Sequence, residues 1–444
     1  MRARALVIGG GVNGLVAAHM LSGTHEVILC AEGDLPEDGV GWVPPQVVRA
    51  LGLHGLQVEA PDPWTVATLP QGGRLELWRD MARSVESIRR VSPADAQKWP
   101  QFCRRMARLA RFLEKIYLEP PPDPLGVRFA LRARLLGRQG LVDLMRILPM
   151  SAAELLDDWF ENDALKGLLG AAGVMHLQQG PRSGGTAFRF LHHHVGSPPG
   201  VFRPPRSNLH DVLKKRPGIE VRQQQVRSIR VEAGRAAGVA LADGEELPAS
   251  HVLSGAHPRR TLLELVDPAW LDPELVRGLR HLRERPVAAR VTLQLDRAPG
   301  FSAFVQAPSL DYLERAYDDS KYGRISQHPH IEAYCDAQHR MEAHVQYVPP
   351  GTDTAALGDL VAAVLSDQLG DAVIESLEVA QPQQPHQVEL SLDQALWMRP
   401  LPQLAHYRTP IQGLWLCGAA MHPGGAIAGA AGYNCARSVL AKRP

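Results

Sequence analysis

Three glycines near the N-terminus, Gly9, Gly11 and Gly14, have the types and spacing needed to hold a phosphate group. The first lets the chain turn sharply, the second lets a phosphate approach the backbone, and the third lets a helix pack closely on a strand. That helix directs unpaired N–H groups and its positive dipole end at a pyrophosphate. Glu32 follows near the offset of about 20 residues at which an acid binds ribose hydroxyls. No arginine stands beside Glu32, so FAD or NAD is favoured over NADP.

The segments around these residues come in the order strand, glycine turn, helix, strand, acid. Residues 3–8 and 27–30 are short apolar runs, and residues 15–21 have helical apolar spacing. A bare Gly-x-Gly-x-x-Gly pattern is weak, because glycine turns also arise by chance. Here the strands, the helix and the acid all fall where dinucleotide binding requires them. The sequence therefore predicts a Rossmann-like unit rather than a purely structural turn.

The overall composition is that of a large chain with balanced charge. Its 444 residues include 48 Lys plus Arg and 47 Asp plus Glu. A chain of this length is expected to form two or more domains, and its charge gives no argument for a nucleic-acid partner. The five cysteines form no Cys-x-x-Cys pair. Neither a disulfide framework nor a zinc ribbon is predicted.

The expected localisation is cytoplasmic, with peripheral membrane contact left open. No apolar run reaches the roughly 18 residues that cross a bilayer, and the apolar start lacks a cleavage site. Arg132, Arg134 and Arg138 are interspersed with Leu131 and Leu135. This pattern fits an amphipathic surface that touches a membrane or guards an apolar substrate entrance. A solvated helix face with extended arginines fits it as well and is the favoured interpretation.

Later segments repeat the opening order. Residues 413–418 are a strand that meets a glycine, 419–425 a turn, and 426–440 a helix rich in small residues. A second helix N-terminus is thus expected to point at whatever the first one binds. Between these ends, the pattern changes to strands from residue 219, with a hairpin turn at residues 243–244.

Several dispersed stretches together resemble a known family. They include VIGGGVNGL at residues 7–15, GGTA at 184–187 and LSGAHP at 253–258. The others lie at residues 191–193, 311–319, 321–326, 328–332, 390–394, 398–400, 407–411, 416–418, 422–425 and 429–432. With them, nearly the whole chain resembles a phytoene desaturase-like flavoprotein of the FAD-dependent amine oxidase and carotenoid desaturase superfamily. The resemblance is sharpest to its pyridine nucleotide-disulphide oxidoreductase domain-like branch.

The resemblance implies an α/β fold in which a Rossmann-like FAD-binding domain is assembled from discontinuous segments. These are residues 1–62, 205–265 and 400–444, while residues 63–204 and 266–399 form an α+β substrate domain. The family pattern implies pyrophosphate contacts from Gly9, Gly11 and Gly14, with the adenosine ribose on Glu32. The further FAD contacts that it implies are at Val226, Gly418, Gly425, Ala426 and Ile427. The C-terminal turn favours FAD over NAD. One departure is at residues 204–209, where Pro-Pro-Arg-Ser-Asn-Leu replaces a glycine-rich turn.

The chemistry implied by the family is dehydrogenation or desaturation of a largely apolar small molecule by hydride transfer to flavin N5. Only one dinucleotide fingerprint is present, so oxygen or a quinone is expected to accept the electrons. Two other functions stay open. One is a flavin amine oxidase, and the other is a flavin-fold scaffold or binding protein without turnover.

The candidates for catalysis are His193 and Arg399. If residues 187–195 form a strand, His193 lies opposite its two histidine neighbours, and structural hydrogen bonding is the favoured role for all three. Arg399 would position an anionic or carbonyl group, or pair with a core carboxylate. Residues 328–344 are rich in metal-ligating side chains, but they overlap a family motif that has no metal. No metal site is expected.

Overall fold

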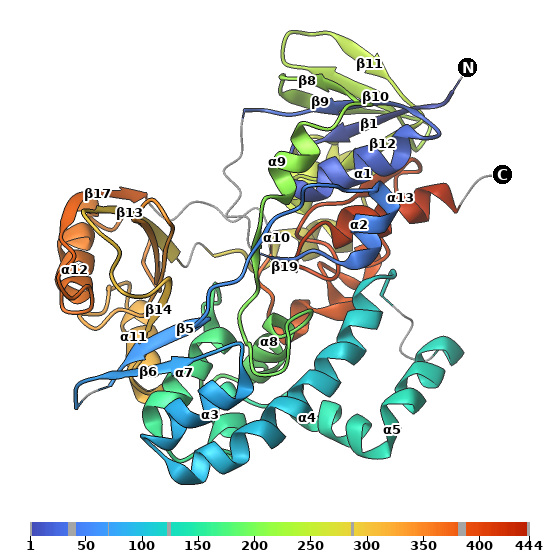
Figure 1. Ribbon diagram of the computed structural model, residues 1–444. Helices are drawn as coiled ribbons and strands as arrows, with labels where there is room; N and C mark the ends of the chain where they lie inside the picture. The colour runs from blue at the N-terminus through green and yellow to red at the C-terminus, as the bar shows by residue number, and fades with distance from the viewer. Residues whose placement is uncertain are drawn as a thin grey trace.

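Two large β-sheets and a group of helices organise the chain (Figure 1). The computed structural model describes residues 2–33, 41–69, 71–121, 126–285, 288–380 and 388–441. One sheet has five strands in the order β18-β12-β1-β2-β8, and the other has seven in the order β17-β13-β16-β15-β14-β5-β6. Figure 1 shows the seven-stranded sheet and the five-stranded sheet on opposite sides of the molecule.

The five-stranded sheet is parallel throughout and joins three distant parts of the chain. Its strands are β1 (Arg4–Ile8), β2 (Glu26–Cys30), β8 (Glu220–Arg222), β12 (His251–Ser254) and β18 (Leu414–Leu416). Both faces of the central strands are buried, which explains their continuous apolar runs. Helices α1 (Val12–Ser22) and α13 (Ala430–Leu440) pack together beside it. A Cβ on Gly432 would lie 2.0 Å from the Asn13 carbonyl oxygen, so this approach requires glycine.

The seven-stranded sheet has one apolar face and one polar face. Its strands are β5 (Thr65–Thr68), β6 (Arg74–Leu77), β13 (Ala288–Leu295), β14 (Ala303–Gln306), β15 (Ile331–Cys335), β16 (Arg340–Gln346) and β17 (Ile374–Ala380). Helix α12 (Thr354–Ser366) covers the apolar face, where Val361 packs with Val291 and Met341. Because side chains alternate along a strand, Glu332 and Glu342 lie on the opposite face.

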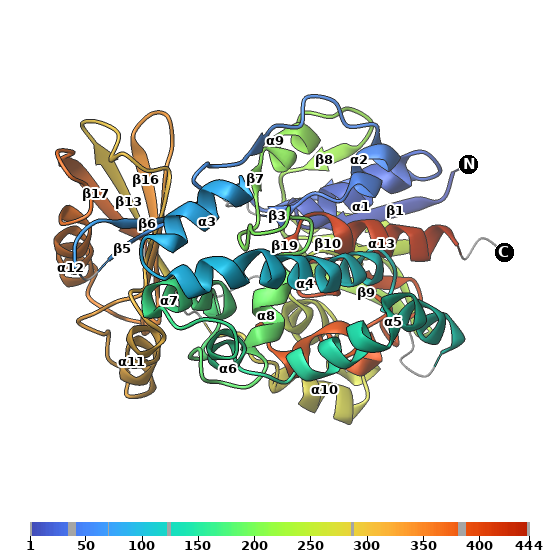
Figure 2. The same ribbon diagram turned by 60° about the horizontal axis from the view of Figure 1, so that its bottom comes forward.

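A group of neighbouring helices forms an aromatic core next to the seven-stranded sheet. They are α3 (Met81–Arg89), α4 (Pro93–Tyr117), α5 (Val127–Ile147), α6 (Ala152–Asp157), α7 (Asp163–Val174) and α8 (Thr186–His193). Figure 2 shows α4 running along the molecule with α5 and α8 beside it. Phe102 contacts the rings of Trp99, Phe160 and Phe202 in this core. Ser151 and Glu154 form a capping box at the start of α6.

Shorter elements connect these layers. They are β3 (Gly41–Trp42), α2 (Pro45–Leu51), β4 (Val58–Glu59), β7 (Arg206–Ser207), α9 (Leu209–Lys214), β9 (Val226–Glu232), β10 (Arg235–Leu241), β11 (Glu246–Pro248), α10 (Pro273–Arg280), α11 (Leu310–Lys321) and β19 (Ala426–Ile427). The domain boundaries stay a prediction. The core of the five-stranded sheet also includes Leu271, Leu275 and Leu279.

Three local expectations differ from the structure. Residues 187–195 are mainly helix α8 rather than a strand, because a short buried apolar run has no period that separates the two. The helix expected from residue 426 begins at Ala430, after the two-residue strand β19. The turn at residues 243–244 leads into β11 and only then into β12, so the hairpin partner of β10 is β11.

Helix α5 presents exposed apolar side chains beside its arginines. Val127, Leu131 and Leu135 recur every four residues before an interruption at Gly137 (φ 75°), and further exposed apolar side chains follow it. Contact of this face with a lipid surface stays a prediction. Across the described residues, none of the helices combines the length and apolar character needed to pass through a bilayer.

Candidate functional site

The glycine turn between β1 and α1 is tightly closed. Gly9 has a φ of 98°, and its N–H donates to the Cys30 carbonyl oxygen at 2.8 Å. A Cβ on Gly14 would lie 2.2 Å from the Gly9 carbonyl oxygen, so the helix sits directly on the turn. Gly11 is the N-cap of α1 and supplies no side-chain cap. The positive end of the helix therefore faces the space in front of the turn.

A cavity of about 480 Å³ opens in front of this turn. Its walls come from all three distant parts of the five-stranded sheet. They are formed by Ile8, Gly9, Gly10, Gly11, Val12, Asn13, Gly14, Cys30, Glu32, Gln224, Gln225, Val226, Gly255, Ala256, His257, Arg260, Leu265, Gly418 and Ala419. The volume lies within the range typical of small-molecule sites. The structure thus brings Gly9, Gly11, Gly14, Glu32, Val226 and Gly418 together around one space.

The wall facing the glycine turn contains residues that the sequence did not single out. A Cβ on Gly418 would lie 2.3 Å from the Gly255 carbonyl oxygen, so two glycine segments cross closely there. Arg260 donates to the Glu32 carboxylate at 3.1 Å. Both side chains are about half exposed, so this ion pair is weak and leaves carboxylate lone pairs for another donor. The LSGAHP motif at residues 253–258 was the available signal, and Arg260 follows it closely.

The C-terminal turn that carries Gly425, Ala426 and Ile427 does not line this cavity and has contacts of its own. Ala426 has a φ of 69° and pairs in parallel with Gly41 of β3. The Gly425 carbonyl oxygen lies 2.6 Å from His192 Nε2. A carbonyl oxygen only accepts, so Nε2 carries the proton, and Nδ1 accepts from the Tyr117 hydroxyl at 2.8 Å. A buried hydroxyl–imidazole–carbonyl chain therefore fixes this turn.

His193 faces away from that chain. Its Nδ1 lies 2.7 Å from the Ala172 carbonyl oxygen of α7, and burial holds the pKa of the imidazole well below its usual value. His192, rather than His193, contacts the turn that the sequence assigned to the flavin. A catalytic role for His193 stays a prediction, and Tyr117 and His192 are the groups whose position here the sequence missed.

Arg399 is fully buried and hydrogen-bonds to the backbone. Its N–H groups donate to the carbonyl oxygens of Val388, Glu389, Gln394, Ala419 and Met421 at 3.1–3.2 Å. Burial, reinforced by nearby Arg189, lowers its pKa to about 9. The guanidinium thus joins the segment before residue 400 to the turn after β18. A direct role in positioning substrate stays a prediction.

The buried histidines predict a stability that falls in mild acid. Burial holds the pKa values of His192 and His193 well below 6.5, that of His194 near 4 and that of His422 near 3. Near pH 6.5 these imidazoles therefore bind protons in the unfolded chain but stay neutral in the folded chain. The stabilisation is complete above that pH and is lost as pH falls, by up to about 1.4 kcal/mol per pH unit for each histidine. Urea unfolding at several pH values measures this, and a stability unchanged from pH 7 to pH 5 would contradict it.

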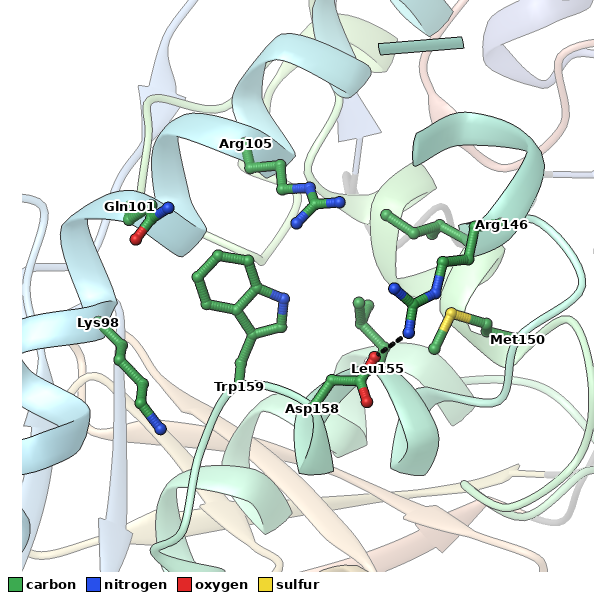
Figure 3. Close-up of a pocket in the computed structure, with 9 residues that line it drawn as sticks. Lys98, Gln101, Arg105, Arg146, Met150, Leu155, Asp158 and Trp159 are labelled. Atoms are coloured by element: carbon green, nitrogen blue, oxygen red, sulfur yellow. Dashed lines mark hydrogen bonds and ion pairs between the residues drawn. The ribbon is translucent and has the colours of Figure 1, made fainter. Parts of the chain in front are cut away.

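A second cavity of about 460 Å³ lies among α4, the end of α5 and α6 (Figure 3). Figure 3 shows Trp159 between the side chains of Lys98 and Arg105, with Arg146 bonded to Asp158. The cations here already have acidic partners: Arg105 pairs with Asp143, and Arg146 with Asp158 at 2.6 Å. In the part of the chain that the structure describes, no set of three or more His, Cys, Asp or Glu side chains is placed to hold a metal ion.

Curated proteins similar to this chain are redox proteins. Pyridine nucleotide-disulfide oxidoreductase domain-containing protein 2 of Mus musculus is 28% identical, over 98% of this chain and 93% of its own length. A limonene dehydrogenase component of Castellaniella defragrans is 23% identical over 98% of this chain and 94% of its own length. Hydroxyneurosporene desaturase of Rubrivivax gelatinosus is 28% identical over 56% of this chain and 52% of its own length. The resemblance to phytoene desaturase-like oxidoreductases is confirmed. No family model matches the chain.

Solved structures give the same fold. An oxidoreductase from Methanosarcina mazei covers 99% of this chain with a TM-score of 0.60 and 14% identity. A putrescine oxidase variant covers 99% with a TM-score of 0.62 and 13% identity. Their fold is that of FAD-dependent oxidoreductases, so the predicted α/β class with a Rossmann-like unit is confirmed. Together with the relatives, this also confirms the predicted class of enzyme, an oxidoreductase.

Proposed function

We propose that this protein is a FAD-dependent oxidoreductase that dehydrogenates or desaturates a largely apolar small molecule. One observation carries the proposal: a single cavity is lined by the glycine turn, Glu32, Val226 and Gly418, which come from distant parts of the chain. A glycine turn with a purely structural role does not explain why an acid and two further glycine segments surround the same cavity.

The residues around the cavity fit FAD. A pyrophosphate can lie against the N–H groups at the start of α1, and the close packing of Gly14 on Gly9 fixes the helix on the glycine turn. The Glu32 carboxylate can accept from ribose hydroxyls, and Val226 offers an apolar wall at the adenine end. When bound, FAD supplies a hydride acceptor at N5. The electron acceptor is oxygen or a quinone, because the sequence has only one dinucleotide fingerprint.

The chain positions and shields the reacting groups rather than supplying a strong acid or base. The Tyr117–His192–Gly425 chain orients the C-terminal turn. Phe190 of α8 packs against Phe102 in the aromatic core, so this side of α8 is shielded from water. Support for an apolar substrate comes from the relatives, since limonene and hydroxyneurosporene, named in two of them, are largely hydrocarbon.

The test is the visible absorption spectrum of the purified protein, first as isolated and then after incubation with FAD and removal of the unbound FAD. We expect flavin bands, and anaerobic bleaching of them by an apolar hydrocarbon such as limonene or a carotenoid. Bleaching by putrescine instead would favour an amine oxidase. Bleaching by NADH would refute the proposed electron acceptor. A protein with no flavin bands even after FAD is added would be a scaffold, and the proposal would fail.

A further inference from the structure

A small cavity near β7 is bordered by two residues, Trp64 and Arg203, that carry buried N–H donors without an acceptor. It measures about 60 Å³ and borders Trp64 and Arg203, whose exposed fractions are 5% and 7%. Among the described residues, Trp64 Nε1 and the Nε and Nη1 atoms of Arg203 have no hydrogen-bond partner. An indole and a guanidinium only donate. The three donors are buried on two residues of one cavity. A ligand there would have to accept hydrogen bonds from them.

The guanidinium of Arg203 is held in place by its neighbours. Its Nη2 donates to Glu332 at 3.0 Å, and its plane lies 3.8 Å from the centre of the Tyr334 ring. The same ring contacts Arg206, which donates to Glu342 at 2.8 Å. The Arg203 side chain is thus already ordered without a ligand. Binding therefore costs little side-chain conformational entropy.

The charges around the cavity are balanced rather than strongly positive. Arg79, Arg203 and Arg206 line it together with Glu59, and two of these arginines are paired with Glu332 and Glu342. Net attraction is therefore modest, and the unpartnered donors, rather than the net charge, carry the inference. We expect an affinity that depends strongly on hydrogen bonding.

This cavity borders the segment in which the chain departs from its family. Pro204, Pro205 and Arg206 line it, and they belong to the stretch that replaces the glycine-rich turn. The Pro205 carbonyl oxygen accepts from Gly41 of β3, which pairs with Ala426 of β19. Figure 2 shows β7, β3 and β19 close together near the middle of the molecule.

We propose that this cavity is an oxyanion-binding site that takes the carboxylate of a small organic acid. A carboxylate offers lone pairs to all three donors, and charge-assisted bonds of this kind are stronger than neutral ones. The cavity is small, at about 60 Å³, which suits a planar carboxylate better than a bulkier phosphate. The site lies outside the glycine-lined cavity, so the inference stands whether or not the flavin proposal holds.

The experiment is calorimetric titration of the purified protein, with its flavin content as isolated. We expect hexanoate to bind one-to-one and hexanamide, its neutral counterpart, to bind at least about tenfold more weakly. Trp64→Phe removes one donor and keeps an aromatic ring, so it should weaken hexanoate binding about three- to tenfold. Trp99→Phe is the matched control, because the Trp99 Nε1 is also buried and unpartnered but its residue does not line this cavity.

The double variant Arg203→Met, Glu332→Gln removes the cation without leaving its partner charged. It should abolish measurable hexanoate binding. If this variant does not fold, the effect of Trp64→Phe on hexanoate affinity tests the proposal. Equal affinity for hexanoate and hexanamide, no binding of hexanoate, or equal effects of Trp64→Phe and Trp99→Phe would overturn the proposal. Inorganic phosphate binding more tightly than hexanoate would overturn the carboxylate assignment.

Discussion

Replacing Gly14 by alanine is expected to weaken FAD binding at least about 100-fold. The new Cβ would lie 2.2 Å from the Gly9 carbonyl oxygen, a separation that backbone atoms cannot accept. Either the helix moves away from the strand or the turn opens, and both displace the N–H groups that would face the pyrophosphate. The flavin content per chain and the FAD dissociation constant, from flavin fluorescence, measure the effect.

The matched control lies at the other end of the same helix. Gly23 is the C-cap of α1 with a φ of −64°, and a Cβ there would meet nothing within 4 Å. Gly23→Ala should therefore leave FAD affinity within about twofold of the original. If both variants bind FAD as well as the unchanged protein does, the glycine turn is not the cofactor site.

Replacing Arg399 by methionine is expected to lower the free energy of unfolding by about 3–5 kcal/mol. Methionine fills much of the space but donates nothing, so five buried carbonyl oxygens lose their partner. The segments before residue 400 and after β18 then lose their main link. Urea unfolding monitored by circular dichroism measures the change.

Arg89→Met is the control for this prediction. The Arg89 side chain is 56% exposed and pairs with Glu86, so its loss should change stability by less than about 0.5 kcal/mol. A variant at Arg399 that keeps full stability and bound flavin but no longer reduces it with substrate would contradict the structural role. That result would favour the substrate-positioning role predicted from the sequence.

The predicted cofactor-binding residues could be found because residue types at short, fixed spacings signal them. Gly9 has a positive φ and a Cβ on Gly14 would meet the Gly9 carbonyl oxygen, so the turn itself favours glycine at both positions. An acid at a fixed offset follows from the length of one strand–helix–strand unit. The same reasoning found the C-terminal strand and Gly418. Each of these features depends on neighbours within a few residues or on one short supersecondary unit.

Long-range contacts made the rest unpredictable. Glu32 meets Arg260, and His192 meets Tyr117, across separations in sequence that no periodicity records. The five carbonyl partners of Arg399 are backbone atoms, so no residue type signals them. Residues 187–195 could be recognised only as a buried segment, because their apolar residues form a run with no period that separates strand from helix.

The strand order of the five-stranded sheet also determines when, during synthesis, the sheet and its cavity can be completed. Strand β1 is made first but pairs with β12, and β12 in turn pairs with β18, whose residues 414–416 come late in the chain. Gly418, which closes the cavity wall, is translated later still. The nascent chain therefore holds an incomplete parallel sheet with exposed edges for most of its synthesis, a state that folds slowly and favours aggregation. The glycine-lined cavity is therefore complete only once residues 414–419 have been made and β18 has paired with β12.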